Sequence, residues 1–126
     1  MAQIDRYLIE LVRASGSDLH LYAGRTPFVR VHGVISPIAE EPVLASEDIF
    51  QLVKEIMPEA NINQLTRDWD TDCAYEIPGV ARFRVNGFRD MNGYGSVLRV
   101  IPEQIPSFEE LNLPAVLRDF CMLTKG

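Results

Sequence analysis

The sequence lacks long apolar runs, and none approaches the ~20 residues that a bilayer-spanning helix needs. The first residues do not fit a secretion signal, because Asp5, Arg6 and Glu10 interrupt every apolar stretch. The two cysteines form no motif, and two histidines are a poor basis for a closed zinc site, which needs about four ligands. These scarcities predict a cytoplasmic protein without a metal centre.

Lysine is also scarce, with two lysines against ten arginines. The formal net charge of −6 argues against general nucleic-acid binding. The charge is unevenly distributed, since residues 40–76 carry −8 and residues 77–101 carry +3. An acidic segment beside a basic one can neutralise itself internally or join like subunits head to tail. Arginine favours fixed, forked contacts over diffuse attraction, so the basic segment is the first candidate for binding.

The basic segment, residues 79–102, predicts two β-strands joined by a tight turn. The Asn92-Gly93 dipeptide is typical of a type I′ turn, which needs positive φ at both central residues. Centring the turn on these residues predicts three opposed pairs: Arg84 with Ile101, Asn86 with Arg99, and Phe88 with Val97.

Side chains alternate along a strand, so this hairpin has two distinct faces. One face is apolar and suited to a core: Ala81, Phe83, Val85, Leu98 and Val100. The other face is polar: Arg82, Arg84, Asn86 and Arg99. Guanidinium groups gathered on one face repel each other unless something anionic meets them, and their forked donors suit carboxylate or phosphate oxygens. That anion is either a carboxylate of this domain or a bound ligand.

Hydrophobic periodicity predicts the remaining elements. Helices are expected over residues 2–14, from an N-cap at Ser46 to Pro58, over 59–67, and after Ser107 and Pro114; strands are expected over 17–22, 28–32, 34–35 and 73–77. This order is not an alternating βα pattern, and it predicts an α+β domain with a mostly antiparallel sheet and helices on one face. The polar hairpin face would then be open. Asp18 and His20 share one side of their strand, as an acid–base pair or as a structural pair.

Five segments in order carry a resemblance to a known family: ASGSDLH at 14–20, PFVRVHG at 27–33, YEIPGVARFRVN at 75–86, RVIP at 99–102 and FEELNLP at 108–114. Together they resemble the N-terminal region of the type IV pilus retraction ATPases, the PilT or twitching-motility branch of the secretion ATPase superfamily. The uninterrupted run PGVARFRVN looks more like retraction motors than pilus-assembly or secretion relatives.

The resemblance implies a PAS-like domain over residues 1–102 and a helical linker over residues 103–126, leading in the family to a RecA-like motor domain. It also implies a homohexamer that uses ATP and Mg²⁺, at the inner-membrane platform of the pilus, on the cytoplasmic side. The chain contains no G-x-x-x-x-G-K-[ST] and no acidic Walker B strand. We therefore expect a fragment that hydrolyses no ATP alone, since positioning phosphates and Mg²⁺ is most of phosphoryl-transfer catalysis.

In this family, two arginines of the N-terminal domain approach the nucleotide phosphates when the domain closes on the motor domain. The resemblance places these at Arg84 and Arg99, and Arg82 is a third candidate that contacts either nucleotide or a neighbouring subunit. The implied function is nucleotide sensing and subunit coupling in a hexameric ATPase that powers pilus retraction. Three alternatives stay open: a free-standing PAS-like sensor binding a small anion, a pure assembly module, and arginines paired with acids such as Asp70 or Asp72.

Overall fold

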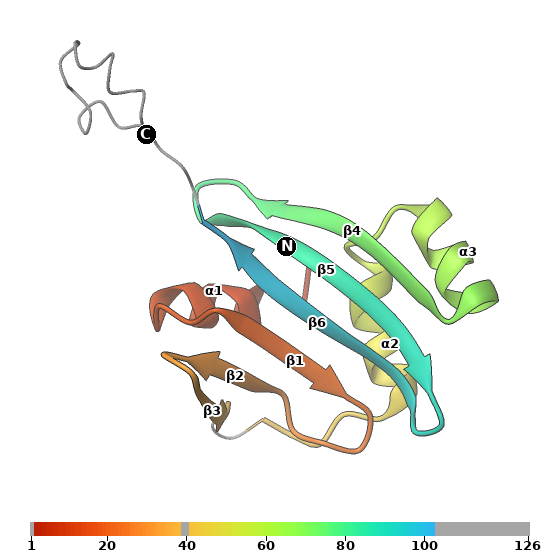
Figure 1. Ribbon diagram of the computed structural model, residues 1–126, viewed down its shortest axis with the longest axis horizontal. Coiled ribbons are helices and arrows are strands. Elements are labelled where there is room, and N and C mark those ends of the chain that lie inside the picture. Colours follow the sequence, from red (N-terminus) through yellow and green to blue (C-terminus); the bar gives the residue numbers. More distant parts are fainter. Residues whose placement is uncertain (1, 39–40, 103–126) are drawn as a thin grey trace, which may run out of the picture.

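A sheet with helices packed on one of its faces forms the described part of the chain, residues 2–38 and 41–102 of the computed structural model (Figure 1). The elements follow in the order α1 (Asp5–Arg13), β1 (Asp18–Tyr22), β2 (Phe28–Val31), β3 (Val34–Pro37), α2 (Ser46–Lys54), α3 (Glu59–Asp68), β4 (Asp70–Ile77), β5 (Ala81–Asp90) and β6 (Gly93–Ile101). This matches the predicted element order from the first helix to the end of β6. The helices predicted after Ser107 and Pro114, and with them the predicted linker, lie outside the described residues.

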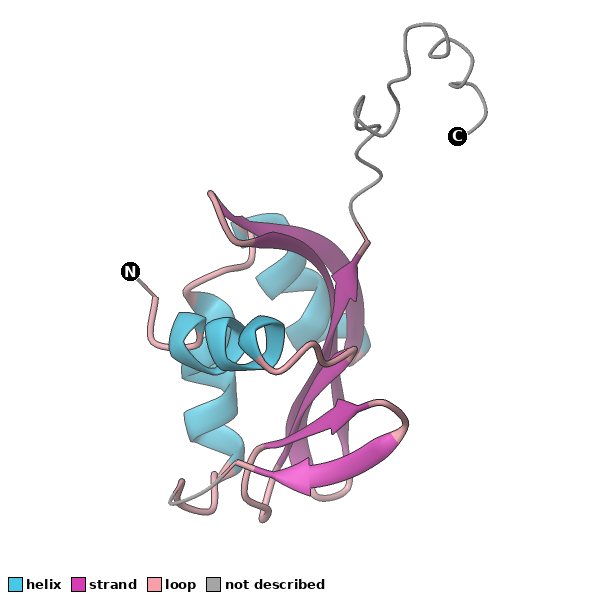
Figure 2. Ribbon diagram, turned by 90° about the vertical axis from the view of Figure 1, so that its left-hand side faces the viewer, coloured by secondary structure: helices cyan, strands magenta, loops and turns pink. Residues whose placement is uncertain are grey.

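The six strands form one antiparallel sheet in the order β3-β2-β1-β6-β5-β4. Strand β1 is the junction, because it pairs with β2 on one side and with β6 on the other. The helices all lie on one side of this sheet, which Figure 2 shows edge-on. The predicted α+β architecture, an antiparallel sheet with helices on one face, is confirmed. The PAS-like label stays a prediction.

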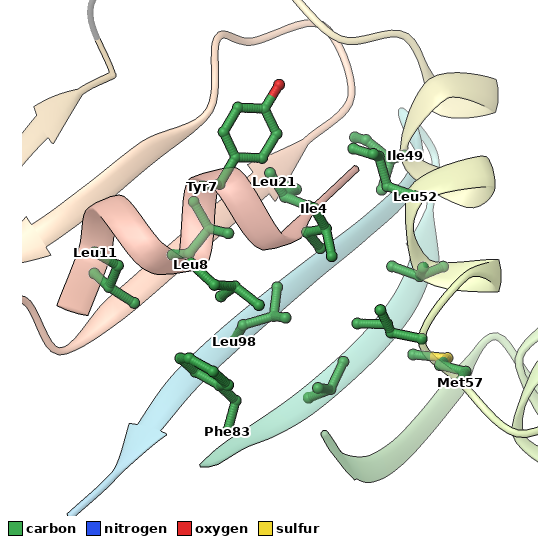
Figure 3. Close-up of a cluster of buried hydrophobic side chains, with 14 of the residues drawn as sticks. Ile4, Tyr7, Leu8, Leu11, Leu21, Ile49, Leu52, Met57, Phe83 and Leu98 are labelled. Atoms are coloured by element: carbon green, nitrogen blue, oxygen red, sulfur yellow. The ribbon is translucent and has the colours of Figure 1, made fainter. Parts of the chain in front are cut away.

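The hydrophobic core lies between the helices and the sheet (Figure 3). Its fully buried side chains come from both layers: Ile4, Leu8, Leu11, Ile49 and Leu65 from the helical side, and Leu19, Leu21, Phe83, Val85 and Leu98 from the strands. The three hairpin residues in this set belong to the face predicted to be apolar, and Ala81 and Val100 pack against the same cluster. Burial of one sheet face fixes which side chains of the hairpin remain outside, since strand side chains alternate.

The turn between β5 and β6 differs from the predicted type I′ turn. The loop residues are Met91 and Asn92, and Asp90 pairs with Gly93. Of these four residues only Gly93 has a positive φ, 124°, so the two consecutive positive angles that a type I′ turn needs are missing. The Asp90 carboxylate instead accepts a hydrogen bond from the Asn92 N–H at 2.9 Å, a local turn that competes with the predicted one.

The predicted register of the hairpin is therefore wrong by two residues. Arg84 lies opposite Arg99, not Ile101, and Asn86 lies opposite Val97. A shift of two residues keeps every side chain on its predicted face, because the side-chain period of a strand is two. The correction thus brings the two candidate arginines directly opposite each other.

A two-residue turn with positive φ at both positions does occur, between β2 and β3. Val31 pairs with Val34, and the intervening His32 and Gly33 have φ of 51° and 80°. The expected tight turn at Gly33 is therefore present, in the geometry that had been assigned to Asn92-Gly93.

The start of α2 also differs from its prediction. Ser46 is the first residue of the helix, and Ala45 is the N-cap. The Asp48 carboxylate accepts a hydrogen bond from the Ala45 N–H at 2.9 Å, while the Ser46 hydroxyl accepts one from the Tyr94 N–H of β6 at 2.8 Å. Ser46 therefore ties the helix to the sheet, and the helix ends at Lys54, before the expected stop at Pro58.

Candidate functional site: the helix-free face of the sheet

A row of charged residues crosses four strands on the helix-free face of the sheet, the face turned away from the helices in Figure 2. The strand register aligns Arg30 of β2 with Asp18 of β1, Asp18 with Arg99 of β6, and Arg99 with Arg84 of β5. We call these four residues the arginine row. Its formal charge is +2, because it contains three guanidinium groups and one carboxylate. Antiparallel strands place opposed Cα atoms only about 4.5–5.5 Å apart, so the charges act on one another.

Arg84 is exposed, and no carboxylate among the described residues forms an ion pair with it. The acids that had been considered as its partners, Asp70 and Asp72, are instead bound by Asn86. The Asn86 side-chain amide donates to an Asp70 oxygen at 3.2 Å and to an Asp72 oxygen at 3.3 Å. The structural alternative of an Arg84 pair with either acid is therefore absent from the described part of the chain.

A shallow depression of about 280 Å³ lies beside the two arginines. It is lined by Asp72, Arg84, Asn86, Val97 and Arg99. This volume is just below the ~300–1,000 Å³ typical of small-molecule pockets, and the site is open to solvent on the helix-free face. The depression can accept part of an anion and cannot enclose a whole nucleotide.

Arg99 is paired but still accessible. Its Nε donates to Asp18 Oδ1 at 3.3 Å, and 67% of its side chain remains exposed. A guanidinium carries five N–H donors, so this single contact leaves the terminal nitrogens free for another acceptor. Sequence reasoning missed Asp18 as a partner of Arg99, because nothing local indicates that β1 lies beside β6.

His20 lies two residues after Asp18 on the same face of β1, and its side chain is largely buried. Its ring stacks on Phe28 at 4.8 Å between centroids, its Nδ1 lies 3.2 Å from the Tyr22 hydroxyl, and its Nε2 lies 3.5 Å from Asp18 Oδ2. Burial lowers the pKa of the His20 imidazole, although the adjacent Asp18 carboxylate acts in the opposite direction. The geometry fits the structural alternative for the Asp18–His20 pair, because only 12% of the His20 side chain is exposed.

Arg82 lies two residues before Arg84 on the same face of β5. It is exposed, and the register places it between Glu76 of β4 and Ile101 of β6. It is thus outside the arginine row and does not line the depression. Of the three predicted site residues, the fold brings Arg84 and Arg99 together and leaves Arg82 at the side.

No group of three or more His, Cys, Asp or Glu side chains suited to a metal ion occurs within residues 2–38 and 41–102. The arginine row instead offers fixed positive charge and forked donors, which match phosphate and carboxylate oxygens. The arrangement is chemically suited to binding an anion.

Comparison with known proteins identifies the domain. No family model matches the chain. Over 114 residues, or 90% of its length, it is 36% identical to the type IV pilus retraction ATPase PilT of Pseudomonas aeruginosa. Its fold superposes on the pilus retraction motor PilT with bound ADP at a TM-score of 0.76, with 32% identity over 97% of the chain. The chain is the N-terminal domain of a PilT-type ATPase.

Two further relatives extend this comparison. The PilT-type domain is 32% identical over 98% of its length to the type IV pilus ATPase PilU of Pseudomonas aeruginosa. It superposes on the ATPase DotB of Legionella pneumophila at a TM-score of 0.69, with 27% identity over 92% of the chain. It spans about a third of the length of these proteins: 33% of PilT, 32% of PilU, 36% of the solved PilT chain and 33% of DotB. PilT, PilU and DotB are all described as ATPases, and PilT and PilU as ATPases of the type IV pilus.

Among the helices of the described residues, none combines the length and the apolar character that crossing a membrane requires.

Proposed function

We propose that this PilT-type domain senses nucleotide and couples subunits in a hexameric ATPase that powers type IV pilus retraction. In this proposal ATP and Mg²⁺ are bound by a motor domain, and Arg84 and Arg99 reach the phosphates when the two domains close. Arg82 contacts either the nucleotide or a neighbouring subunit. The ATPase would act in the cytoplasm, at the inner-membrane platform of the pilus.

The observation that carries this proposal is the pairing of Arg84 with Arg99 on the helix-free face of the sheet. Both side chains are exposed, and the acids of β4 that could have neutralised Arg84 are bound by Asn86. Two adjacent fixed cations in open solvent repel each other, so an unoccupied face is electrostatically unfavourable. A phosphate group brought by a second domain would relieve this repulsion and gain charge-assisted hydrogen bonds.

The same geometry accounts for coupling. Fixed charge aimed at phosphoryl oxygens stabilises both bound nucleotide and the charge that develops during transfer. The contacts between the arginines and the nucleotide form only when the domain is closed on the motor domain. Nucleotide would therefore bind the closed state more tightly than the open state and shift the population toward closure. Release of phosphate would remove this difference and allow the domain to reopen. ATP turnover would thereby be converted into movement between domains around the ring.

A titration of the isolated chain separates this proposal from a free-standing anion sensor. We expect MgATP to bind the 126-residue chain with a Kd weaker than about 1 mM, a free energy no better than about −4 kcal/mol. The physical reason is that the shallow depression beside Arg84 and Arg99 leaves most of a nucleotide in water, where salt screens the two charges. Isothermal titration calorimetry measures this directly.

The matched control is the double variant Arg84→Ala, Arg99→Ala, titrated under the same conditions. Any weak heat of binding that depends on Arg84 and Arg99 should be absent from the titration of this variant. Micromolar binding to the wild-type chain that the double variant abolishes would contradict the proposal and favour a sensor that needs no motor domain.

A further inference from the structure

Asp18 is a buried carboxylate that contacts the Nε side of the Arg99 guanidinium. The residue is only 5% exposed. Its Oδ1 accepts a hydrogen bond from Arg99 Nε at 3.3 Å, and its Oδ2 lies 3.4 Å from Arg30 Nε and 3.5 Å from His20 Nε2. A carboxylate so far removed from water needs such partners, so Asp18 is anchored from both sides.

We propose that Asp18 is a positioning residue for Arg99. The inference rests on the phosphate role proposed for Arg99 and adds a residue to that site. The contact uses the Nε edge of the guanidinium, and the opposite edge, with the terminal nitrogens, remains in the exposed part of the side chain. A guanidinium that is hydrogen-bonded at its Nε–H keeps its orientation, so the side chain loses less conformational freedom when a phosphate binds its terminal nitrogens.

Arg84 provides an internal comparison. It lies directly opposite Arg99 and is exposed, but none of the ion pairs within the described residues includes it. The two arginines that meet in the arginine row therefore differ in how they are held. Arg99 has a fixed direction, whereas Arg84 is free to adjust to the anion. Such a division lets one side chain set the position of a phosphate while the other adapts to it.

Arg30 shows that Asp18 does more than neutralise one charge. It contacts the second oxygen of the same carboxylate, and 40% of its side chain is exposed. Replacing Arg30 should leave the Asp18–Arg99 contact in place, because the two arginines contact different oxygens of Asp18, so Arg30→Gln is a matched control for the mobility of Arg99.

The first measurement uses the 126-residue chain and needs no activity. In a ¹⁵N-labelled sample, we expect the Nε–H of Arg99 to give a heteronuclear NOE close to that of the backbone, and the Nε–H of Arg84 to give a much lower one. Asp18→Asn should lower the Arg99 value to that of Arg84, and Arg30→Gln should leave it unchanged. Equal mobility of the two arginines in the wild-type chain would overturn the inference, even if Asp18→Asn failed to fold.

The second measurement is ATP turnover of the full-length ATPase in a double-mutant cycle. Asp18→Asn should lower kcat about 10-fold with a smaller change in KM, because it disorders a group that acts on the transition state. In the Arg99→Ala background the same substitution should lower kcat less than about twofold, since the group it positions is gone. The activity control is Arg13→Ala, which replaces an exposed arginine of α1 outside the arginine row and should stay within about twofold of wild type.

The outcomes separate the two ideas. An equal loss from Asp18→Asn in both backgrounds would show a merely structural role and overturn the positioning inference, while the phosphate role of Arg99 stands. Wild-type turnover of Asp18→Asn would overturn it in the same way. If Arg99→Ala itself turned over ATP like wild type, the phosphate role would fail first, and the inference about Asp18 would fail with it.

Discussion

ATP turnover of the full-length ATPase should fall about 100-fold or more when either Arg84 or Arg99 is replaced by Ala. Removing one preorganised donor from an oxyanion site typically costs 10²–10³ in kcat, and arginines that meet a transferring phosphoryl group contribute about 10³–10⁵. The two residues lie opposite each other on β5 and β6, so in the proposed role each substitution would leave the phosphate with only one of two cations. The measurement is steady-state phosphate release at saturating MgATP.

The matched control for these variants is Arg13→Ala. Arg13 is an arginine of α1 with 74% of its side chain exposed, and α1 packs on the opposite face of the sheet (Figure 2). Its loss removes the same charge and side chain without touching the arginine row, so turnover should remain near wild type. Wild-type turnover in both Arg84→Ala and Arg99→Ala would remove the proposed role, and an equal loss in all three variants would point to net charge alone.

The second large effect concerns stability. Phe83→Ala should lower the free energy of unfolding by about 3–5 kcal/mol, the usual cost of deleting a buried aromatic ring. Phe83 is fully buried and projects from β5 into the core shown in Figure 3. It is also the residue between Arg82 and Arg84, so the cavity forms directly behind the arginine row. Urea unfolding of the 126-residue chain, followed by circular dichroism, measures the change.

Val34→Ala is the control for this prediction. Val34 lies on the edge strand β3 and is 65% exposed, so its truncation removes apolar atoms that are already in water. Such surface substitutions usually change stability by less than about 0.5 kcal/mol. A Phe83→Ala variant as stable as Val34→Ala would contradict the core packing described here.

Local patterns were sufficient to predict the element types and the faces of the hairpin. The alternation of arginines with Ala81, Phe83 and Val85 assigned one face to the core, and the buried residues confirm it. Alternation survives errors in register of two residues, which is why Arg84 and Arg99 remain on one face although their partners were misassigned.

Features that depend on longer-range contacts were not predictable in the same way. The pairing of β1 with β6 joins residues about eighty positions apart, and no periodicity indicates it. Asp18 therefore could be assigned to a strand face but not to Arg99. The turn at residues 91–92 was mispredicted because the Asp90 carboxylate accepts a hydrogen bond from the Asn92 N–H. The N-cap predicted at Ser46 was wrong because the Ser46 hydroxyl accepts its hydrogen bond from Tyr94 of β6, and Ala45 is the N-cap.

The most direct measurement is a structure of the full-length ATPase with Mg²⁺ and a non-hydrolysable ATP analogue. In nucleotide-bound subunits, we expect terminal nitrogens of Arg84 and Arg99 within about 3.2 Å of phosphate oxygens. Asp18 should still bind the Nε edge of Arg99 in that state. Arginines that face solvent, or only carboxylates, in every nucleotide-bound subunit would contradict a role in phosphate recognition.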